Sequence, residues 1–185
     1  MPVVPMAPGC LMAEPATSTS DAHVMVREKV FSRPDYFLAF GLGSGLSPKA
    51  PGTAGSIVGL LLFMPILLLP VYVQLAFVIA GFVFGCWLCE RVAEDMSVKD
   101  PGGIVWDEFV GMWIVMLWLP NWYWLIVAFV LFRFFDILKP WPVSLADKSL
   151  DGGLGIMVDD VLAGLYALGI LQAIAWTLGL GIVSI

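Results

Sequence analysis

The sequence predicts an all-α membrane protein, a polytopic helical bundle, from its composition and from the positions of its charged residues. Of the 185 residues, 60% are hydrophobic, whereas soluble domains are about 45–50% apolar. Three stretches, residues 50–89, 109–132 and 161–185, contain no Asp, Glu, Lys or Arg. Uncharged stretches of this length suit a lipid interior, because a straight helix needs about 20 residues to cross it.

Prolines divide the uncharged stretches into about five predicted membrane helices. Pro70 and Pro120 mark the breaks, because a proline and the residue before it disfavour continued helix. The five predicted helices are residues 56–69, 71–89, 104–119, 122–138 and about 157–185. The first is short enough to be a tilted half-span or a re-entrant helix. The alternative, one kinked span over residues 109–132, would place Asp107 and Arg133 on opposite sides of the membrane.

The basic residues predict the orientation of this bundle. The turns at Pro70 and Pro120 and the C-terminus carry no side-chain charge, so all nine Lys and Arg residues fall on the other side, together with the N-terminus. The positive-inside rule makes that side cytoplasmic. Residues 1–30, which are rich in Pro, Ser and Thr, are expected to form a flexible tail, and residues 31–185 a single membrane domain.

Composition and missing motifs exclude several classes of function. The net charge of −6 argues against nucleic-acid binding, which needs a basic patch. Cys86 and Cys89 form a Cys-x-x-Cys pattern inside an apolar run, where we expect them to pack as small apolar side chains. The single histidine, His23, lies in the predicted tail, so a histidine-based mechanism has no candidate. Neither a cysteine-phosphatase loop nor an Asp-x-Asp-x-Thr motif is present.

Acidic residues gather where the predicted helices meet the charged side. They are Asp107 and Glu108 at the start of the third helix, Asp136 near the end of the fourth, and Asp159 and Asp160 at the start of the fifth. The helix dipole alone favours acids at a helix start, but it does not explain several carboxylates at similar depth beside lipid-length helices. Clustered carboxylates repel one another unless a cation lies between them, and their oxygens suit Mg²⁺. We therefore expect these five residues to bind Mg²⁺ or to orient an attacking water.

Basic residues on the same side are the candidates for binding phosphate. Arg133, Asp136 and Lys139 recur every three residues and so share one helical face. Arg133 and Lys139 are expected to contact phosphate, with pairing to Asp136 alone as the alternative for Arg133. A glycine-rich stretch, residues 41–56, precedes the first predicted helix and contains Lys49. Glycines let backbone N–H groups approach an anion at a helix start, so Lys49 is expected to contact phosphate as well, although an ordinary flexible connector would have the same composition.

Four stretches of the chain resemble the phosphatidylglycerophosphatase A family, in the order in which that family has them. They are residues 43–56, 104–113, 132–142 and 152–164. The resemblance implies a multi-pass lipid phosphatase of the bacterial inner membrane that depends on Mg²⁺. It would hydrolyse the phospholipid phosphatidylglycerophosphate to phosphatidylglycerol and phosphate, the last step of phosphatidylglycerol synthesis. Its site would face the cytoplasm, with the acyl chains of the substrate remaining in the bilayer.

Two other functions fit parts of the sequence less well. Asp151-Gly152 begins like the signature of the CDP-alcohol phosphotransferases but lacks the Ala-Arg that should follow. A small transporter or proton-conducting protein could use the same acidic cluster, since acids within membrane segments mark ion paths. Such a path needs polar residues across the opposite half of the bundle, where Gln74 and Asn121 are among the few. The sequence does not predict the oligomeric state.

Overall fold

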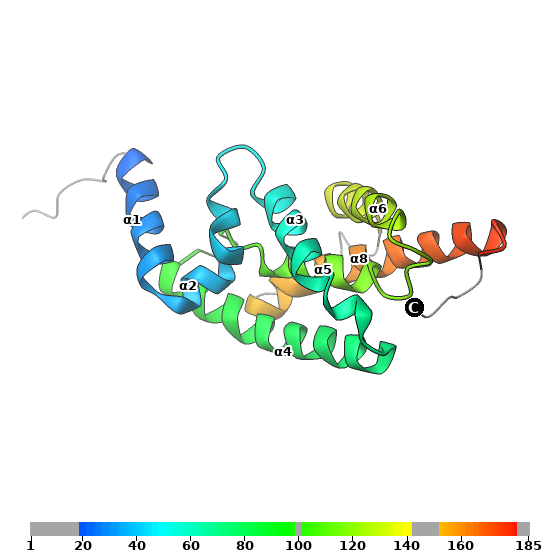
Figure 1. The fold of residues 1–185 in the computed structure, drawn as a ribbon. Helices are drawn as coiled ribbons and strands as arrows, with labels where there is room; N and C mark the ends of the chain where they lie inside the picture. Colours follow the sequence, from blue (N-terminus) through cyan, green and yellow to red (C-terminus); the bar gives the residue numbers. More distant parts are fainter. Residues whose placement is uncertain (1–18, 99–100, 142–151, 181–185) are drawn as a thin grey trace, which may run out of the picture.

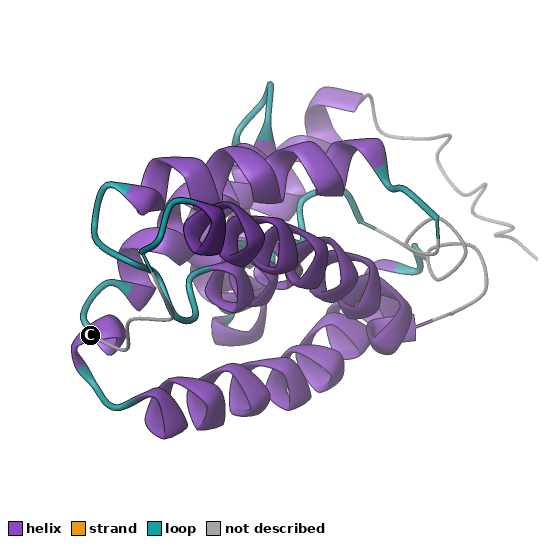
Figure 2. Ribbon diagram, turned by 90° about the vertical axis from the view of Figure 1, so that its right-hand side faces the viewer, coloured by secondary structure: helices purple, strands orange, loops and turns teal. Residues whose placement is uncertain are grey.

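The uncharged stretches fold into helices in the computed structural model, and no strand occurs within residues 19–98, 101–141 and 152–180, which are the residues that the structure describes (Figures 1 and 2). The helices are α1 Thr19–Ser32, α2 Pro34–Ala39, α3 Pro51–Phe63, α4 Val71–Met96, α5 Trp106–Val115, α6 Trp124–Leu138 and α8 Gly152–Thr177. Two short 3₁₀ segments, η1 Gly41–Leu46 and η2 Ile66–Leu68, flank α3. The prediction of an all-α helical bundle is confirmed.

Three helical segments are long and apolar enough to cross a membrane. They are Pro51–Leu68, Val71–Met96 and Gly152–Thr177. By contrast α5 has 10 residues and α6 has 15, which correspond to about 15 and 22 Å of helix, less than the roughly 30 Å of a hydrocarbon core. All five predicted membrane helices are therefore present as helices, and the number that span the bilayer stays a prediction.

The short helix α5 forms the centre of the bundle. Every side chain from residue 109 to residue 115 is buried, and α3, α4, α6 and α8 pack around it. A helix that is apolar on all faces is expected to be enclosed in this way. Two tryptophans fix it to its neighbours, because Trp106 Nε1 donates to the Gly81 carbonyl oxygen (3.1 Å) and Trp113 Nε1 donates to the Gly59 carbonyl oxygen (2.9 Å).

Glycines bring α5 and α8 into backbone contact. A Cβ atom on Gly164 would lie 2.6 Å from the carbonyl oxygen of Gly111, and a Cβ on Gly111 would lie 2.8 Å from the carbonyl oxygen of Asp160. Neither position leaves room for a side chain, and small residues permit such close approach between membrane helices. The crossing places the acidic start of α5 beside the acidic segment of α8.

α8 begins five residues before the predicted start at Met157. Its backbone at Gly153 passes close to α4, where an added Cβ would lie 1.9 Å from the Cys86 carbonyl oxygen. Glu90 on α4 accepts a hydrogen bond from Gly153 N at 2.7 Å, which satisfies one of the N–H groups at the helix start. Glu90 therefore caps α8. Cys89 is fully buried, with its Sγ 3.9 Å from Met157 Sδ, and Cys86 is half-buried.

At the opposite end of the bundle, polar side chains hold turns together. Gln74 Nε2 donates to the Leu69 carbonyl oxygen at 2.9 Å, across the turn between η2 and α4. Gln172 Nε2 donates to the Trp118 carbonyl oxygen at 2.9 Å, where Trp118 has a φ of +56°. This turn ends α5 at Val115, before the predicted break at Pro120.

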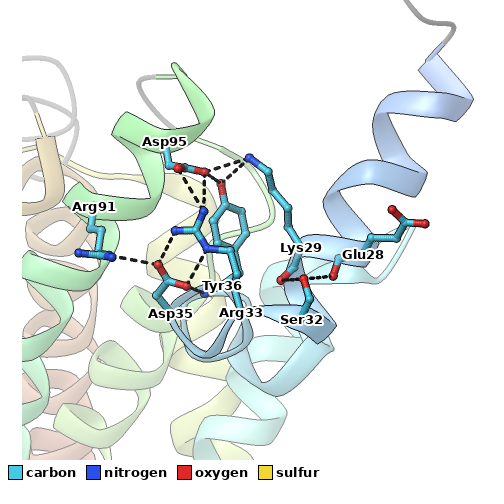
Figure 3. Close-up of polar contacts among 8 residues, drawn as sticks. All are labelled: Glu28, Lys29, Ser32, Arg33, Asp35, Tyr36, Arg91 and Asp95. Atoms are coloured by element: carbon cyan, nitrogen blue, oxygen red, sulfur yellow. Dashed lines mark hydrogen bonds and ion pairs between the residues drawn. The ribbon is translucent and has the colours of Figure 1, made fainter.

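An ion-pair network joins α1 and α2 to the end of α4, as Figure 3 shows. It consists of Lys29, Arg33, Asp35, Arg91 and Asp95. The predicted boundary between tail and membrane domain at residue 30 falls inside α1, and residues 1–18 of that tail lie outside the described part of the chain. The aromatic ring of Tyr36 packs beneath the network, and its hydroxyl donates to Asp95 Oδ2 at 2.6 Å.

Candidate active site

Three of the five predicted acidic residues meet between α5 and α8. Asp107 and Glu108 lie in the first turn of α5, and Asp160 lies on the turn of α8 that touches Gly111. One oxygen from each carboxylate lies within 4.8 Å of the other two. Asp160 is only 3% exposed, whereas Asp107 and Glu108 are half-buried. We call Asp107, Glu108 and Asp160 the carboxylate cluster.

Two oxygens of the carboxylate cluster are buried without a hydrogen-bond partner among the described residues. They are Asp107 Oδ1 and Glu108 Oε2. A buried polar atom left unpaired destabilises a protein, and a buried charge does so more strongly. The three carboxylates each have an oxygen close enough to the other two to bind the same ion, and two of them have an oxygen without a described partner. Such a set of oxygen atoms matches the ligands of Mg²⁺ and Ca²⁺. The residues present therefore fit a divalent cation of this kind.

Arg133 on α6 lies beside this cluster and is paired with Asp136. Its Nη1 is 2.6 Å from Asp136 Oδ2 and 3.9 Å from Glu108 Oε1. Its Nε is buried without a partner in the described part of the chain. Asp136 also lies near Asp160. The pair expected between Arg133 and Asp136 is thus present, and the same guanidinium also faces the carboxylate cluster.

The first turn of α3 closes the site on a further side. A Cβ on Gly52 would lie 2.2 Å from Glu108 Oε1 and 3.0 Å from Arg133 Nη1, so a larger residue there would displace these two side chains. Four residues on, the buried Ser56 donates from its Oγ to the Gly52 carbonyl oxygen (2.8 Å) and accepts from Arg133 Nη1 (3.3 Å). The N–H groups of a first helical turn have no partner within their helix and favour an anion.

Asp159 and Lys139 form a pair next to the carboxylate cluster. Lys139 Nζ lies 2.6 Å from Asp159 Oδ2, and Asp159 Oδ1 accepts a hydrogen bond from Asp160 N at 3.0 Å. Lys139 ends α6 with a φ of +43°, which turns the chain after that helix. Asp159 is therefore held by a cation, whereas Asp160, the next residue, belongs to the carboxylate cluster.

Lys49 is the one predicted site residue that the structure leaves on the surface of the described chain. It is exposed in the loop that precedes α3, and no ion pair connects it to a described acidic residue. It stands two residues before Pro51, where α3 begins. Its predicted contact with phosphate stays a prediction.

The sequence predicts the glycine-rich stretch 41–56, which includes Gly52 and Ser56, as a possible anion-binding segment, but it does not predict the contact of Ser56 with Arg133. The four-residue spacing between Gly52 and Ser56 indicates one helical face. The residue that this face meets, Arg133, lies 77 positions away along the chain, and no local pattern identifies it.

Comparison with known proteins gives one consistent family. The family model for phosphatidylglycerophosphatase A matches residues 37–175. Phosphatidylglycerophosphatase A of Escherichia coli K12 is 45% identical over 155 residues, which are 83% of this chain and 90% of the relative. The protein of the same name from Haemophilus influenzae is 50% identical over 146 residues, 77% of this chain and 90% of the relative.

A more distant relative carries a different substrate in its name. A Bacteroides thetaiotaomicron protein, provisionally named phosphatidylinositol-3-phosphatase, is 38% identical over 148 residues, 75% of this chain and 92% of the relative. No solved structure matches the chain. The family model spans most of the chain and includes every residue of the site just described. The chain is thus an enzyme of the lipid phosphatase class and belongs to the phosphatidylglycerophosphatase A family, as its four sequence stretches predicted.

Proposed function

We propose that this protein hydrolyses phosphatidylglycerophosphate to phosphatidylglycerol and phosphate, using Mg²⁺ bound by Asp107, Glu108 and Asp160, as a step of phosphatidylglycerol biosynthesis. The observation that carries the proposal is the carboxylate cluster, whose oxygens lie within 4.8 Å of one another and face Arg133. Both relatives above 40% identity are named for this substrate. A metal with a neighbouring guanidinium is a suitable arrangement for phosphate-ester hydrolysis.

Charge balance supports a metal at this position. When bound, Mg²⁺ would neutralise charge on phosphate oxygens and make a bound water molecule easier to deprotonate. The ligands would be Asp107, Glu108 and Asp160, because these have mutually close oxygens and two of the oxygens have no other described partner. Asp136 would orient Arg133 rather than bind the metal, since it already pairs with Nη1 at 2.6 Å.

Arg133 and the first turn of α3 would bind the phosphate group. The guanidinium offers N–H donors that suit phosphate geometry, and its Nε has no partner in the described part of the chain. Ser56 and Asp136 fix its direction. The bare backbone at Gly52 allows the first-turn N–H groups of α3 to lie at the same place. Negative charge that develops on phosphoryl oxygens would then meet donors that are already oriented, which is a major source of rate enhancement.

The position of the site among apolar helices suits a lipid substrate. α3 and α8, which contribute to the site, are both within segments long and apolar enough to span a bilayer. A headgroup phosphate could reach the carboxylate cluster while the acyl chains remain in the bilayer. The basic residues share this end of the bundle, so the positive-inside rule supports a site on the cytoplasmic side of the inner membrane.

The transporter alternative is not favoured by the polar side chains of the opposite end. Gln74 donates to the Leu69 carbonyl oxygen, and Asn121 Oδ1 accepts from Tyr123 N. Both side chains stabilise turns of their own segments, so within the described residues they do not extend a polar path from the carboxylate cluster.

Phosphate release from the detergent-solubilised protein tests the proposal directly. Phosphatidylglycerophosphate should be hydrolysed with Mg²⁺ and not after chelation, and Asp107→Asn should lower turnover at least about 100-fold, since even outer-shell partners of a metal are worth 10–100-fold. Glu28→Gln, which makes the same charge change on an exposed residue of α1, should leave turnover unchanged. Faster hydrolysis of phosphatidylinositol 3-phosphate would contradict the substrate, and full activity of Asp107→Asn would contradict the metal site.

A further inference from the structure

A groove between α2 and α4 forms a second site on this molecule, separate from the carboxylate cluster. It has a volume of about 630 Å³, which lies within the range of about 300–1,000 Å³ usual for small-molecule sites. None of the residues that line it belongs to the carboxylate cluster or to its neighbours Arg133, Asp136 and Asp159. The inference rests on Leu38 of α2 and on Phe84, Trp87 and Arg91 of α4. Arg33 and Asp35, which form an ion pair with each other, also line the groove.

The groove is apolar along one part and cationic at its rim. Leu38 and Phe84 provide aliphatic and aromatic surface, and Trp87 remains 54% exposed. Arg91 lies one turn beyond Trp87 on α4, with its guanidinium carbon 5.7 Å from the centre of the indole ring. An amphiphilic molecule with an anionic end has the complementary arrangement of charge and apolar surface.

Arg91 is held in place by one hydrogen bond from its Nε, and its terminal nitrogens have no partner in the described part of the chain. Its Nε donates to Asp35 Oδ2 at 3.1 Å, as Figure 3 shows. No other hydrogen bond or ion pair of Arg91 occurs in the described part of the chain, and its side chain is 55% exposed. Its terminal nitrogens can therefore bind a further acceptor. The Asp35 carboxylate that it contacts is already shared with Arg33, whose Nη2 lies 2.7 Å from it.

The ion-pair network next to the groove has an excess of one positive charge, which favours binding of an anion. The ion-pair network contains three cations, Lys29, Arg33 and Arg91, against the two carboxylates of Asp35 and Asp95. Of the other acids on this part of α4, Glu90 accepts the hydrogen bond from Gly153 on the α8 side. Glu94 is exposed, and no ion pair joins it to Arg91 in the described structure.

The depth of Arg91 along α4 matches the headgroup region of a bilayer. It lies 20 residues after Val71, where α4 begins, which is about 30 Å of helix and so one hydrocarbon thickness. Trp87 lies one turn deeper. Aromatic side chains at the interface, followed by basic residues on the cytoplasmic side, are the usual contacts of anionic lipid headgroups.

We propose that this groove binds an anionic phospholipid of the bilayer, with its phosphate on the terminal nitrogens of Arg91 and its acyl chain along Leu38, Phe84 and Trp87. The lipid would join α2 to α4 at the end of the bundle where the glycine-rich segment begins. This site is distinct from the carboxylate cluster, so it does not depend on the reaction that the enzyme carries out.

Native mass spectrometry of the full chain, released from detergent with phosphatidylglycerol or phosphatidylcholine, tests the proposal. The wild-type protein should retain phosphatidylglycerol in preference to phosphatidylcholine. Arg91→Ala should lower the retained phosphatidylglycerol about five- to tenfold, as expected for one basic contact with a headgroup. Arg27→Ala removes the same charge from an exposed position on α1 and should retain the lipid as the wild type does.

Further variants separate loss of the lipid from loss of the fold. Trp87→Leu keeps an apolar side chain but removes the ring under Arg91, and it should weaken retention while circular dichroism shows unchanged helix content. Equal retention by Arg91→Ala and the wild type would overturn the proposal. So would retention that Arg133→Met abolishes and Arg91→Ala does not, because the lipid would then occupy the active site. A dimer that disappears with Arg91→Ala would assign the groove to a second copy of the chain instead.

Discussion

The carboxylate cluster and the ion-pair network of α1, α2 and α4 are both groups of charged residues at the same end of the bundle. They differ in the ratio of acidic to basic side chains. In the network, Asp35 and Asp95 each contact two basic side chains, at distances between 2.7 and 3.1 Å. Around the carboxylate cluster, the five acids Asp107, Glu108, Asp136, Asp159 and Asp160 have only Arg133 and Lys139 as described basic neighbours.

The difference separates a structural role from a functional one. Both carboxylates of the network are paired within the protein, and the network connects α1 and α2 to α4. Asp107 Oδ1 and Glu108 Oε2 are instead buried without a described partner, which is the arrangement expected of ligand-binding groups. Charged side chains that abut apolar helices are expensive to keep, and function is the usual reason that they persist there.

Replacing one basic side chain in each group should give the largest contrast. Arg133→Met should lower turnover on the order of 10²–10³-fold, as removal of a donor to developing negative charge does in other enzymes. Lys29→Met removes a cation from the network, where Lys29 Nζ lies 2.9 Å from Asp95 Oδ2, and should keep turnover while lowering the melting temperature. Phosphate release and thermal unfolding, measured on both variants, test the distinction.

The two groups would not differ in function if Lys29→Met lost as much turnover as Arg133→Met at a temperature where both variants are folded. Circular dichroism at the assay temperature provides the control for folding. Substrate dependence sharpens the result, because a residue that acts only in the transition state lowers kcat and kcat/KM together, whereas one that acts by ground-state binding raises KM.

A methyl group at Gly52 should reduce activity by a smaller amount. In Gly52→Ala the new Cβ would lie 2.2 Å from Glu108 Oε1 and 3.0 Å from Arg133 Nη1, so either α3 or these two side chains must shift. Displacement by about 1 Å can lower a rate about 100-fold, and the loss here should approach that value. Gly102→Ala is the matched control, because nothing lies within 4 Å of its added Cβ. Equal activity of the two variants would exclude Gly52 from the site.

Much of the fold followed from hydropathy and proline positions, because a lipid interior restricts where charges can lie. The pattern identified all five apolar helices from α3 to α8, but it misplaced their ends. α5 stops at Val115 because Trp118 adopts a positive φ and its carbonyl oxygen bonds Gln172 on α8, a contact between distant segments. α1 was missed because its sequence is not markedly apolar, and it is joined to α4 by ion pairs between residues more than 60 positions apart.

The sequence predicts which acidic residues lie at the site, but not which of them form the carboxylate cluster and which pair with basic residues. Five acidic residues were proposed together, and only the packing at Gly111 and Gly164 separates Asp160, which meets Asp107 and Glu108, from Asp159, which pairs with Lys139. Adjacent residues in a helix point about 100° apart, so sequence alone does not show which of the two faces α5. The same limit applies to Ser56, whose partner Arg133 comes from another helix.

The smallest expected effect concerns the pH dependence of the network. Hydrogen bonds from Arg33, and then from Arg91 and Tyr36 N, lower the pKa of Asp35 to about 2 in the folded protein, compared with about 4 in an unfolded chain. A lowered folded-state pKa means that this carboxylate stabilises the fold fully above about pH 4 and loses that contribution as the pH falls toward 2. Asp35→Asn should thus lower stability by about 0.2–1 kcal/mol per exposed ion pair lost at neutral pH, and the difference from wild type should shrink as the pH falls from 5 to 3. Thermal unfolding in detergent at several pH values measures it, with Glu28→Gln as the neutral control, and a difference that stays constant over this range would contradict the role given to Asp35.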